Sequence, residues 1–335
     1  MNLQPKKITL DRIADVIAEK FNSSDEITCY VGSNAATPTA SLEALTEAIK
    51  SRQPRLPFIK MIHLLLQGPV PYVAKGLQDR VMTYSTFSGG EVRQAANEGR
   101  AYYLPCTLAN LSSLIGQGRQ YEPDIVFLKV RLNEITGEYS LGLSVEALHT
   151  AIDHAEIVIA ELDASMPFTQ GQSVVDAQSL DYIIEEAVKP VYHFGRPDFD
   201  NLSPEEQRIG ELITHHFIED GITLQVGIGK IPDAVIGTIK DGGFKDLGIQ
   251  TELYGDGLML LEKEGIVTEY GVADLRELTS GEKALAVASI AHPKFRDDFL
   301  SSVVDDSLFT KPVGFSLDRI PRGVRMYDGR ISLED

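Results

Sequence analysis

A carboxylate followed at once by a glycine-rich turn is the first feature of this sequence that could do chemistry. Glu252 closes the apolar stretch "LGIQTEL", and the turn "YGDG" follows it directly. Such a carboxylate is either a solvent-facing residue at a strand end or a nucleophile held at the edge of a sheet. The second interpretation predicts acyl-group chemistry, because a positioned carboxylate can attack a thioester carbonyl.

A second motif, upstream of Glu252, could stabilise the product of that attack. The segment "ITLQVGIGKIPDAV" predicts a strand, a Gly-x-Gly turn at Gly227–Gly229 and a helix opened by Pro232. Such a turn exposes backbone N–H groups, which can donate to a developing oxyanion. The alternative is a tight connection between a strand and a helix. A full dinucleotide fingerprint is absent, since its third glycine position is Pro232.

Both motifs belong to a pattern in which β-branched runs alternate with helical stretches. Strand candidates in the first half are "EITCYVG", "PFIKMIHLLL", "VMTYSTF", "AYYLP", "DIVFLKV", "EIVIAEL" and "PVYHF". Apolar strands separated by helices predict an α/β fold with a parallel or mixed sheet covered on both faces. Ligands bind beyond the carboxyl ends of such strands. Glu252 would end the strand after the one that leads into Gly227–Gly229, so we expect both to lie at the same rim of the sheet, the edge formed by the carboxyl ends of its strands.

Two loops of the first half occupy similar rim positions. The loop "VGSNAATPTA" (31–40) contains small residues and leads into a helix, with Thr37 as the expected N-cap and Pro38 in the first turn. It could admit a flat or phosphorylated group at the helix start, or it could simply cap the helix. The loop "SMPFTQG" (165–171) follows the strand "EIVIAEL", and alone it indicates no ligand.

The sequence predicts two α/β units of unequal length. The polar stretch 194–212 carries two prolines and the helix start "SPEE", which marks a boundary. We therefore predict an N-terminal domain at 1–195, a shorter domain at 205–300 and an unassigned tail at 301–335. Within that tail, "RMYDGRIS" has the Asp-Gly chemistry of a hairpin.

Composition excludes several classes of function. The chain has 335 residues, 43% of them apolar, which suits a globular protein with a sizeable core. A net charge of -18 argues against nucleic acid as a partner, since phosphate binding needs clustered Lys and Arg. The sequence shows neither an apolar run of membrane-spanning length nor a signal-peptide core, so we expect no membrane association.

The cysteines and histidines predict no metal site. Cys29 and Cys106 are far apart and form neither a disulfide framework nor a metal-binding spacing, so we expect a reduced, cytoplasmic protein. We interpret Cys106 as a buried small residue. The seven histidines are scattered and none belongs to an H-E-x-x-H motif, so we assign no metal.

Several segments taken together resemble one family. They are "VGSNAATPTASLEAL", "FSGGEVRQAANEGRAYYLP", "SMPFTQG", "DGITLQVGIGKIPDAV", "LGIQTELYGDG" and "IVTEYGVADLRELTSGEKALAVASIAHPKFRDDFL". The chain resembles the acetyl-CoA hydrolase/transferase family, which includes the 4-hydroxybutyrate and butyrate CoA-transferases. The resemblance runs from about residue 30 to about residue 300 and implies two related, Rossmann-like CoA-transferase domains with the active site between them.

The resemblance implies a mechanism and a set of site residues. The nucleophilic glutamate of the family falls on Glu252, which would carry CoA as a glutamyl thioester between an acyl-CoA, such as acetyl-CoA, and a carboxylate. Coenzyme A would be a substrate, with no tightly bound cofactor. Residues expected to bind CoA or the oxyanion are Gly227, Ile228, Gly229, Gly32, Ala35, Ala36 and Gly255. Residues expected to line the substrate site are Met166, Pro167, Thr169 and Gln250.

The sequence departs from the family pattern in two places. Gln250 stands where the family has a His before Thr-Glu. In addition, "LYGDGLMLLEKEG" runs directly into "IVTEYGVADL", whereas the family has a block there, comparable to a small domain, whose glycine-rich loop covers the CoA. The second domain is therefore expected to be shortened. An open sheet edge invites association, so we expect a homo-oligomer.

The sequence leaves four functions open. An active CoA-transferase uses Glu252 and the glycine turn, and an acyl-CoA hydrolase uses the same nucleophile with water as acceptor. A catalytically silent CoA-binding or interaction protein would account for the missing block. A sugar-phosphate isomerase fits the glycine turn but explains none of the other segments.

Overall fold

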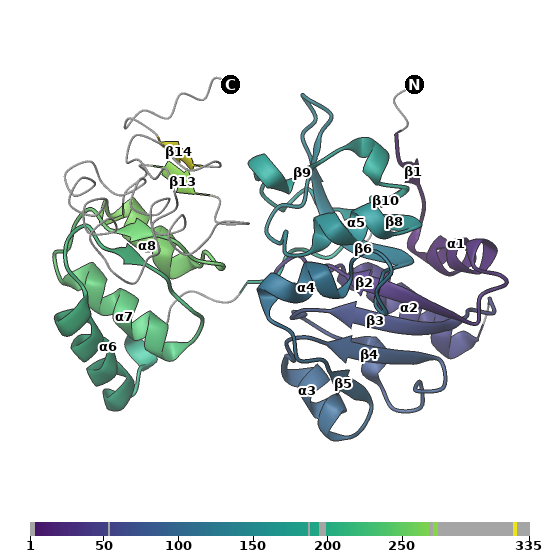
Figure 1. Cartoon of the computed structure of the whole chain (residues 1–335), viewed down its shortest axis with the longest axis horizontal. Helices are drawn as coiled ribbons and strands as arrows, with labels where there is room; N and C mark the ends of the chain where they lie inside the picture. The colour runs from purple at the N-terminus through teal and green to yellow at the C-terminus, as the bar shows by residue number, and fades with distance from the viewer. Residues whose placement is uncertain are drawn as a thin grey trace, which may run out of the picture. The chain divides into compact units, whose positions relative to one another are not determined.

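A computed structural model describes residues 4–52, 54–186, 188–193 and 199–267, together with the short strands Gly271–Ala273 and Val324–Met326. The chain divides into two compact units, Met1–His193 and Phe194–Asp335 (Figure 1). The fold expectation is confirmed for the first unit, which is an α/β structure around a mostly parallel sheet.

The first unit is built on a sheet whose order is β1-β10-β8-β6-β2-β3-β4-β5. Neighbours along this path are parallel, while the short strands β7 and β9 extend from β6 in antiparallel fashion. The bounds are β1 Lys6–Lys7, β2 Glu26–Val31, β3 Phe58–His63, β4 Val81–Ser85, β5 Ala101–Tyr103, β6 Ile125–Leu132, β7 Tyr139–Ser140, β8 Ile157–Leu162, β9 Val174–Val175 and β10 Tyr182–Ile184.

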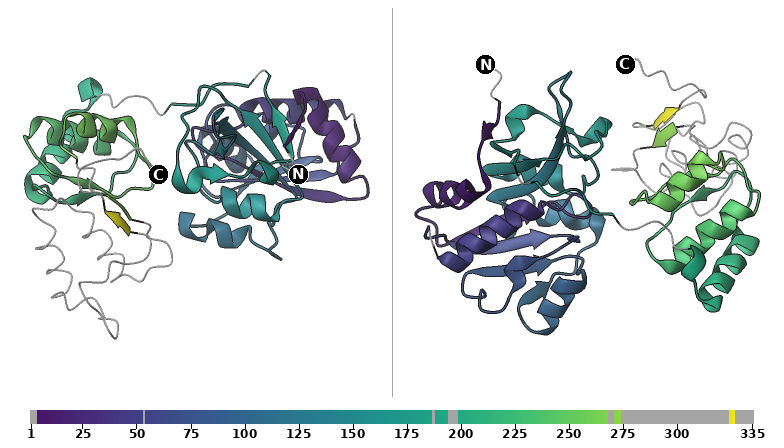
Figure 2. Two further views of the ribbon diagram at one scale, coloured as in Figure 1. Left: turned by 90° about the horizontal axis from the view of Figure 1, so that it is seen from above. Right: turned by 180° about the vertical axis from the view of Figure 1, so that it is seen from behind.

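Helices cover both faces of this sheet, as expected from its continuous apolar strands. α1 (Ile13–Lys20), α2 (Thr39–Ser51) and α3 (Gly90–Asn97) contribute to one core, and α4 (Leu108–Leu114) and α5 (Leu148–His154) to the other (Figures 1 and 2). Phe127 and Leu128, neighbours in β6, belong to opposite cores. Short 3-10 turns lie at Leu10–Arg12, Pro71–Val73, Gly171–Ser173, Ala177–Ser179 and Phe199–Asn201.

The connectivity creates a switch point between β2 and β6. After β2 the chain runs outward through β3, β4 and β5, and then returns to β6 on the other side of β2. The carboxyl ends of strands that flank such a reversal are where α/β sheets bind ligands. The loop 32–38, which follows β2, lies at this point.

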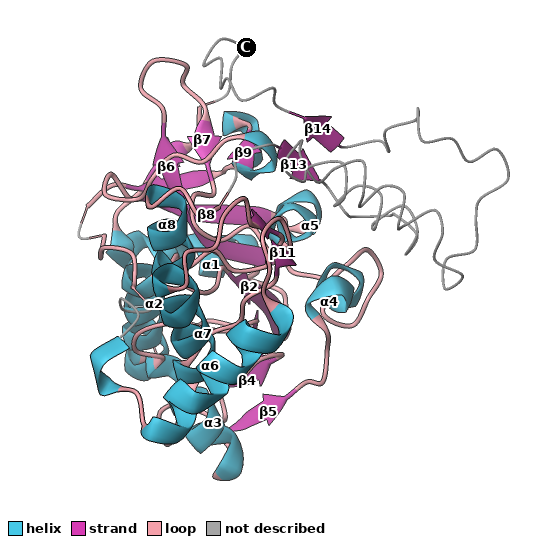
Figure 3. Ribbon diagram, turned by 90° about the vertical axis from the view of Figure 1, so that its left-hand side faces the viewer, coloured by secondary structure: helices cyan, strands magenta, loops and turns pink. Residues whose placement is uncertain are grey.

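The second unit is mainly helical in its described part (Figure 3). It comprises α6 (Pro204–Phe217), β11 (Thr223–Leu224), α7 (Lys230–Asp241), β12 (Gly248–Ile249) and α8 (Asp256–Lys263), and β13 (Gly271–Ala273) pairs with β14 (Val324–Met326). The start of α6 is a capping box between Ser203 and Glu206, which confirms the "SPEE" signal. β11 and β12 pair in parallel above a small core that includes Leu224, Ile239, Leu247, Leu258 and Leu261.

Three local expectations were wrong. Glu252 does not end a strand, because β12 stops at Ile249 and the chain then bends toward the start of α8. Thr37 does not cap α2, whose N-cap is Pro38, because the Thr37 hydroxyl donates to the Asn34 carbonyl instead. Cys106 is only partly buried, since its segment lies at the outer edge of the sheet after β5.

The predicted strand "PVYHF" is also absent over its described residues 190–193. Pro190 has no N–H to donate to a sheet. The amide of Tyr192 donates a hydrogen bond to the Ala35 carbonyl at 2.8 Å rather than to a neighbouring strand. The hairpin predicted at "RMYDGRIS" lies mostly outside the described residues.

Candidate functional site

A pocket in the second unit brings four of the predicted residues together. It has a volume of about 210 Å³ and lies between the start of α7 and the start of α8. Its lining includes Gly227, Ile228, Gly229 and Gly255, the first three from the glycine turn and the last from the turn after Glu252. The pocket places the glycine turn beside Leu253, the residue that follows Glu252, whereas Glu252 itself is not among the lining residues.

Both helices that meet at the pocket begin with a glycine that lacks a capping side chain. Gly229 is the N-cap of α7 and Gly255 is the N-cap of α8. The first N–H groups of a helix have no partner inside the helix, and the helix dipole makes its N-terminus attractive to negative charge. The pocket therefore offers backbone donors to an oxyanion.

Glu252 is an exposed residue in the segment between β12 and α8. Gln225 holds its carboxylate, because the Gln225 Nε2 group lies 3.2 Å from Oε1 and 2.9 Å from Oε2. Thr251, the residue before Glu252, also contacts the residue before the glycine turn. Its hydroxyl donates to the carbonyl oxygen of Val226 at 3.0 Å. The nucleophile candidate is thus tied to the glycine turn through Gln225 and Thr251.

Sequence reasoning missed Gln225 and Thr251. The available signal for Gln225 was its polarity, since it interrupts an apolar run between Leu224 and Val226, whereas Thr251 stands between two polar residues and gave no such signal. Gln225 precedes the glycine turn, and Thr251 precedes Glu252.

The charges around the pocket suit a neutral carbonyl group better than a phosphate. Asp233 and Asp256 lie in the first turns of α7 and α8, where negatively charged side chains interact favourably with the helix dipole. Partial burial raises the pKa of Asp233, and burial together with a hydrogen bond to Glu262 raises the pKa of Tyr254. Lys230 also lines the pocket, and its ammonium lies 3.8 Å from Glu206.

We expect Gly229→Ala to be far more damaging than Gly255→Ala. Gly229 has φ 125° and ψ 179°, a region open essentially to glycine, so alanine there costs about 1–3 kcal/mol. Gly255 has φ -95° and ψ 171°, which any residue adopts, and a Cβ at either position meets open space. Urea unfolding of the two variants measures the difference. Equal tolerance of the two substitutions would show that the turn does not depend on this backbone conformation.

The predicted residues of the loop after β2 pack inside the first unit. Gly32 is in close contact with β6, since its N–H donates to the Phe127 carbonyl at 2.8 Å and a Cβ would lie 3.4 Å from the Leu128 Cα. Ala36 is only 3% exposed. The carbonyl of Ala35 accepts from the Tyr192 amide. In this structure all three hold the loop at the switch point.

The residues expected to line the substrate site fall into two groups. Met166 is buried against Gly142, and Thr169 belongs to a hydroxyl cluster with Ser140 and Ser173, so both organise their own loop. Pro167 and Gln250 are exposed.

The Gln250 amide continues the pairing of β12 by donating to Leu224. Gln250 and the pocket belong to the second unit, whereas Met166, Pro167 and Thr169 belong to the first.

The described residues contain no group of three His, Cys, Asp or Glu side chains arranged to hold a metal ion. Within the same part of the chain, no helix is both long and apolar enough to cross a membrane.

The first unit is a mostly parallel α/β sheet, and the second unit carries an exposed glutamate beside a glycine turn. The sequence matches the model of the acetyl-CoA hydrolase/transferase N-terminal domain over residues 11–193, more than half of the chain, and that of the C-terminal domain over residues 261–303. The chain belongs to the acetyl-CoA hydrolase/transferase family.

Two curated relatives illustrate the similarity. A succinyl-CoA:acetate/propanoyl-CoA:succinate CoA transferase of Fasciola hepatica is 31% identical over 73% of this chain and 49% of its own length. A 4-hydroxybutyrate coenzyme A transferase of Clostridium kluyveri is 36% identical over 62% of this chain and 47% of its own length. The chain thus spans about half the length of the curated relatives that it matches.

Solved structures support the same fold. A 4-hydroxybutyrate CoA-transferase from Porphyromonas gingivalis aligns with a TM-score of 0.61 and 27% identity, over 78% of this chain and 58% of its own. RipA from Yersinia pestis aligns with a TM-score of 0.66 over 78% of this chain and 59% of its own, at 24% identity, which indicates a shared fold.

Proposed function

We propose that this protein transfers CoA between a short-chain acyl-CoA and a carboxylate through a glutamyl-CoA thioester on Glu252. The observation that carries the proposal is the position of an exposed carboxylate, held by Gln225, next to a pocket formed by two glycine-capped helix starts. Membership of the family and its CoA-transferase relatives support the same reaction.

The proposed reaction uses each part of the site. The Glu252 carboxylate attacks the thioester carbonyl carbon, and the C–S bond breaks to give an acyl-glutamyl anhydride and CoA thiolate. The thiolate then attacks the glutamyl carbonyl carbon, releasing the first carboxylate and leaving CoA on Glu252. An acceptor carboxylate reverses these two steps and departs as the new acyl-CoA.

The pocket would bind the thioester end of the acyl-CoA. The oxyanion formed at each step would be met by the first-turn amides of α7 and α8. A volume of about 210 Å³ is below the range of about 300–1,000 Å³ typical of drug-sized ligand sites. The pocket therefore suits a thioester group with a short acyl chain, and the nucleotide end of CoA would lie elsewhere.

Hydrolysis of acyl-CoA is the second candidate, favoured by the exposure of Glu252. Water can reach a thioester formed on an exposed residue, and it would then replace the acceptor carboxylate. The proposal of a homo-oligomer is favoured by β11, which pairs only with β12 among the described residues. Light scattering at several protein concentrations tests that proposal.

Mass spectrometry of the reaction mixture tests the function. Acetyl-CoA without an acceptor is expected to give a protein adduct of CoA on the peptide that contains Glu252. Addition of propionate or butyrate should discharge the adduct as the corresponding acyl-CoA. CoA release without an acceptor identifies a hydrolase. CoA binding without an adduct or a product identifies a catalytically silent protein and contradicts the proposal.

A further inference from the structure

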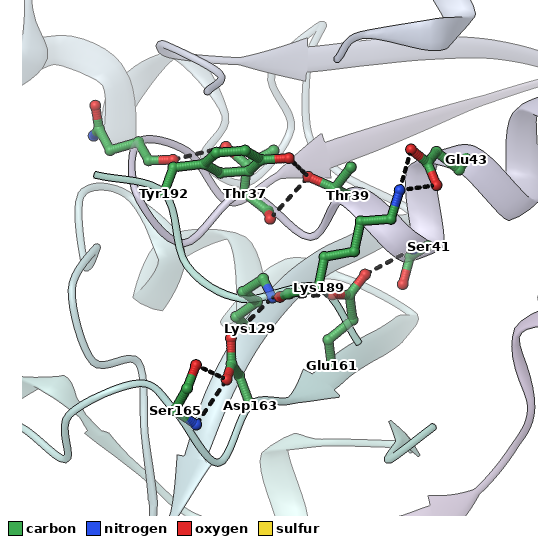
Figure 4. A network of polar contacts seen from close by, with 11 residues as sticks. Thr37, Thr39, Ser41, Glu43, Lys129, Glu161, Asp163, Ser165, Lys189 and Tyr192 are labelled. Atoms are coloured by element: carbon green, nitrogen blue, oxygen red, sulfur yellow. Dashed lines mark hydrogen bonds and ion pairs between the residues drawn. The ribbon is translucent and has the colours of Figure 1, made fainter. Parts of the chain in front are cut away.

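A buried lysine of the first unit shows what burial demands of a polar group (Figure 4). The side chain of Lys129, from β6, is fully buried, and its ammonium lies 3.3 Å from Glu161 and 3.1 Å from Asp163. It also donates to the carbonyl of Lys189. An ammonium group has three protons, so these three acceptors satisfy it. A buried polar group therefore has partners that converge on it, as its loss of hydration requires.

The inner end of the pocket between α7 and α8 has the opposite character. Ile236 and Leu258 line this pocket although they are only 4% and 2% exposed. Val226 adds a third apolar side chain, and its carbonyl oxygen already accepts from Thr251. A polar group of a ligand would lose its hydration here without gaining such partners. The part of a ligand that reaches Ile236 and Leu258 must therefore be apolar.

The outer end of the pocket is polar. Lys230, Asp233 and Asp256 belong to the first turns of the two helices, and the side chain of Lys230 is 65% exposed. The first-turn amides that would meet the oxyanion lie at this end. A thioester carbonyl bound there leaves its acyl chain two directions, toward solvent or toward Ile236 and Leu258. Transfer of methylene groups out of water is favourable, so we expect the chain to point inward.

The pocket ends where the hydrophobic core of the second unit begins. Ile239 lies one turn further along α7, and Leu261 lies one turn further along α8. Both are fully buried and share a core with Ile236 and Leu258, but neither lines the pocket. Protein cores are close-packed, so an acyl chain cannot extend past Ile236 and Leu258 without displacing them.

The volume of the pocket limits the length of that chain. A space of about 210 Å³ holds about seven non-hydrogen atoms, if each takes the ~30 Å³ that a water molecule occupies in the liquid. An acetyl or butyryl thioester group has fewer non-hydrogen atoms than this, and a hexanoyl thioester group has more.

We propose that Ile236 and Leu258 are specificity-determining residues, which set the longest acyl chain that the protein accepts. Butyryl lies within this limit and hexanoyl lies beyond it. The proposal rests on the proposed function, since it takes the acyl group to be bound in this pocket. It depends only on contacts within the second unit.

Truncation of the two side chains tests the limit. Ile236→Ala and Leu258→Ala each lengthen the pocket, and kcat/KM is measured with butyryl-CoA and with hexanoyl-CoA as donors and acetate as acceptor. The wild type should prefer butyryl-CoA by at least about tenfold. Each variant should shift this ratio toward hexanoyl-CoA by about tenfold, because the removed atoms leave room for the longer chain. Both donors are measured on one preparation, so the ratio does not depend on the fraction of folded protein.

Ile239→Ala and Leu261→Ala are the matched controls. They remove the same atoms from the same helices and the same core, one turn away from the pocket. We expect a comparable loss of stability in urea and an unchanged ratio of the two kcat/KM values. If an alanine variant does not fold, Ile236→Val, with Ile239→Val as its control, should shift the ratio in the same direction by at least about twofold.

The outcomes distinguish the chain-length limit from the function. A wild type that uses hexanoyl-CoA as well as butyryl-CoA overturns the limit, while CoA transfer stands. Unchanged ratios in the Ile236 and Leu258 variants overturn the assignment of the limit to these residues, and so do controls that shift as far as they do. A wild type that transfers CoA from neither acetyl-CoA nor butyryl-CoA overturns the proposed function, and this inference with it.

Discussion

The Glu252→Gln protein is expected to lose CoA transfer by at least about a thousandfold while it keeps its fold. An amide is close to a carboxylate in shape and can still contact Gln225, but it cannot attack a thioester carbonyl and cannot carry CoA. Glu252 is exposed, so its replacement leaves no cavity. Rates of CoA transfer and mass spectrometry of the intact protein measure both parts of the expectation.

Glu264→Gln is a suitable control for this variant. Glu264 is another exposed glutamate of the second unit, at the end of α8, and it does not line the pocket. It should transfer CoA at the wild-type rate. If a folded Glu252→Gln protein stayed active or still acquired a CoA adduct, Glu252 would be removed from the mechanism.

A second large effect is expected in the dependence of the free energy of unfolding on pH. It arises from a carboxyl group that is buried in the first unit. Glu146 accepts a hydrogen bond from the Ser33 amide at 2.8 Å on one oxygen, while the other oxygen has no partner among the described residues. Burial raises the pKa of Glu146 from 4.5 to about 8. The unfolded chain therefore releases this proton at a lower pH than the folded one.

The sign of the pH effect follows from that difference. Between pH 4.5 and about 8 the folded state retains a proton that the unfolded state has lost, so stability falls as pH rises. The buried His63 acts in the opposite sense, since burial lowers its pKa from 6.5 to about 4 and stability is lost as pH falls through that range. Above pH 6.5 the Glu146 effect acts without opposition from His63.

Glu146→Gln should remove the loss of stability above pH 6.5. A slope of about 1.4 kcal/mol per pH unit gives the wild type a loss of about 2 kcal/mol between pH 6.5 and 8 relative to this variant. The glutamine can keep the bond to Ser33 and does not titrate. Urea unfolding at the two pH values measures the difference, with the exposed Glu134→Gln as control. Parallel pH profiles for wild type and Glu146→Gln would contradict the expectation.

The sheet of the first unit was predictable because its strands are buried on both faces. A strand such as β6 then needs apolar residues at nearly every position, and "DIVFLKV" shows this directly. The glycine turn of the second unit was predictable for a different reason. Such turns are determined locally, so the Gly-x-Gly turn before α7 is present even though β11 and β12 contain only two residues each.

Long-range polar contacts were beyond sequence reasoning. Ser33 and Glu146 are 113 residues apart, and Thr39 and Tyr192 are 153 apart, so no local pattern indicates either pair. The segment "PVYHF" was predicted as a strand because it is rich in residues that favour strands. One signal was present in the sequence: Lys129 interrupts an apolar run, and a lysine in such a place requires buried acceptors.

The pairing of β1 with β10 bears on how the protein is made. The two strands lie side by side, although they come from opposite ends of the first unit (Figure 1). During synthesis β1 emerges first but has no neighbour until Ile184 has left the ribosome, and until then β8 is an open edge to which other nascent chains can pair. β10 ends at Ile184 and the first unit ends at His193, so only a few further residues complete this unit. The first unit can therefore finish folding before Glu252 has been translated.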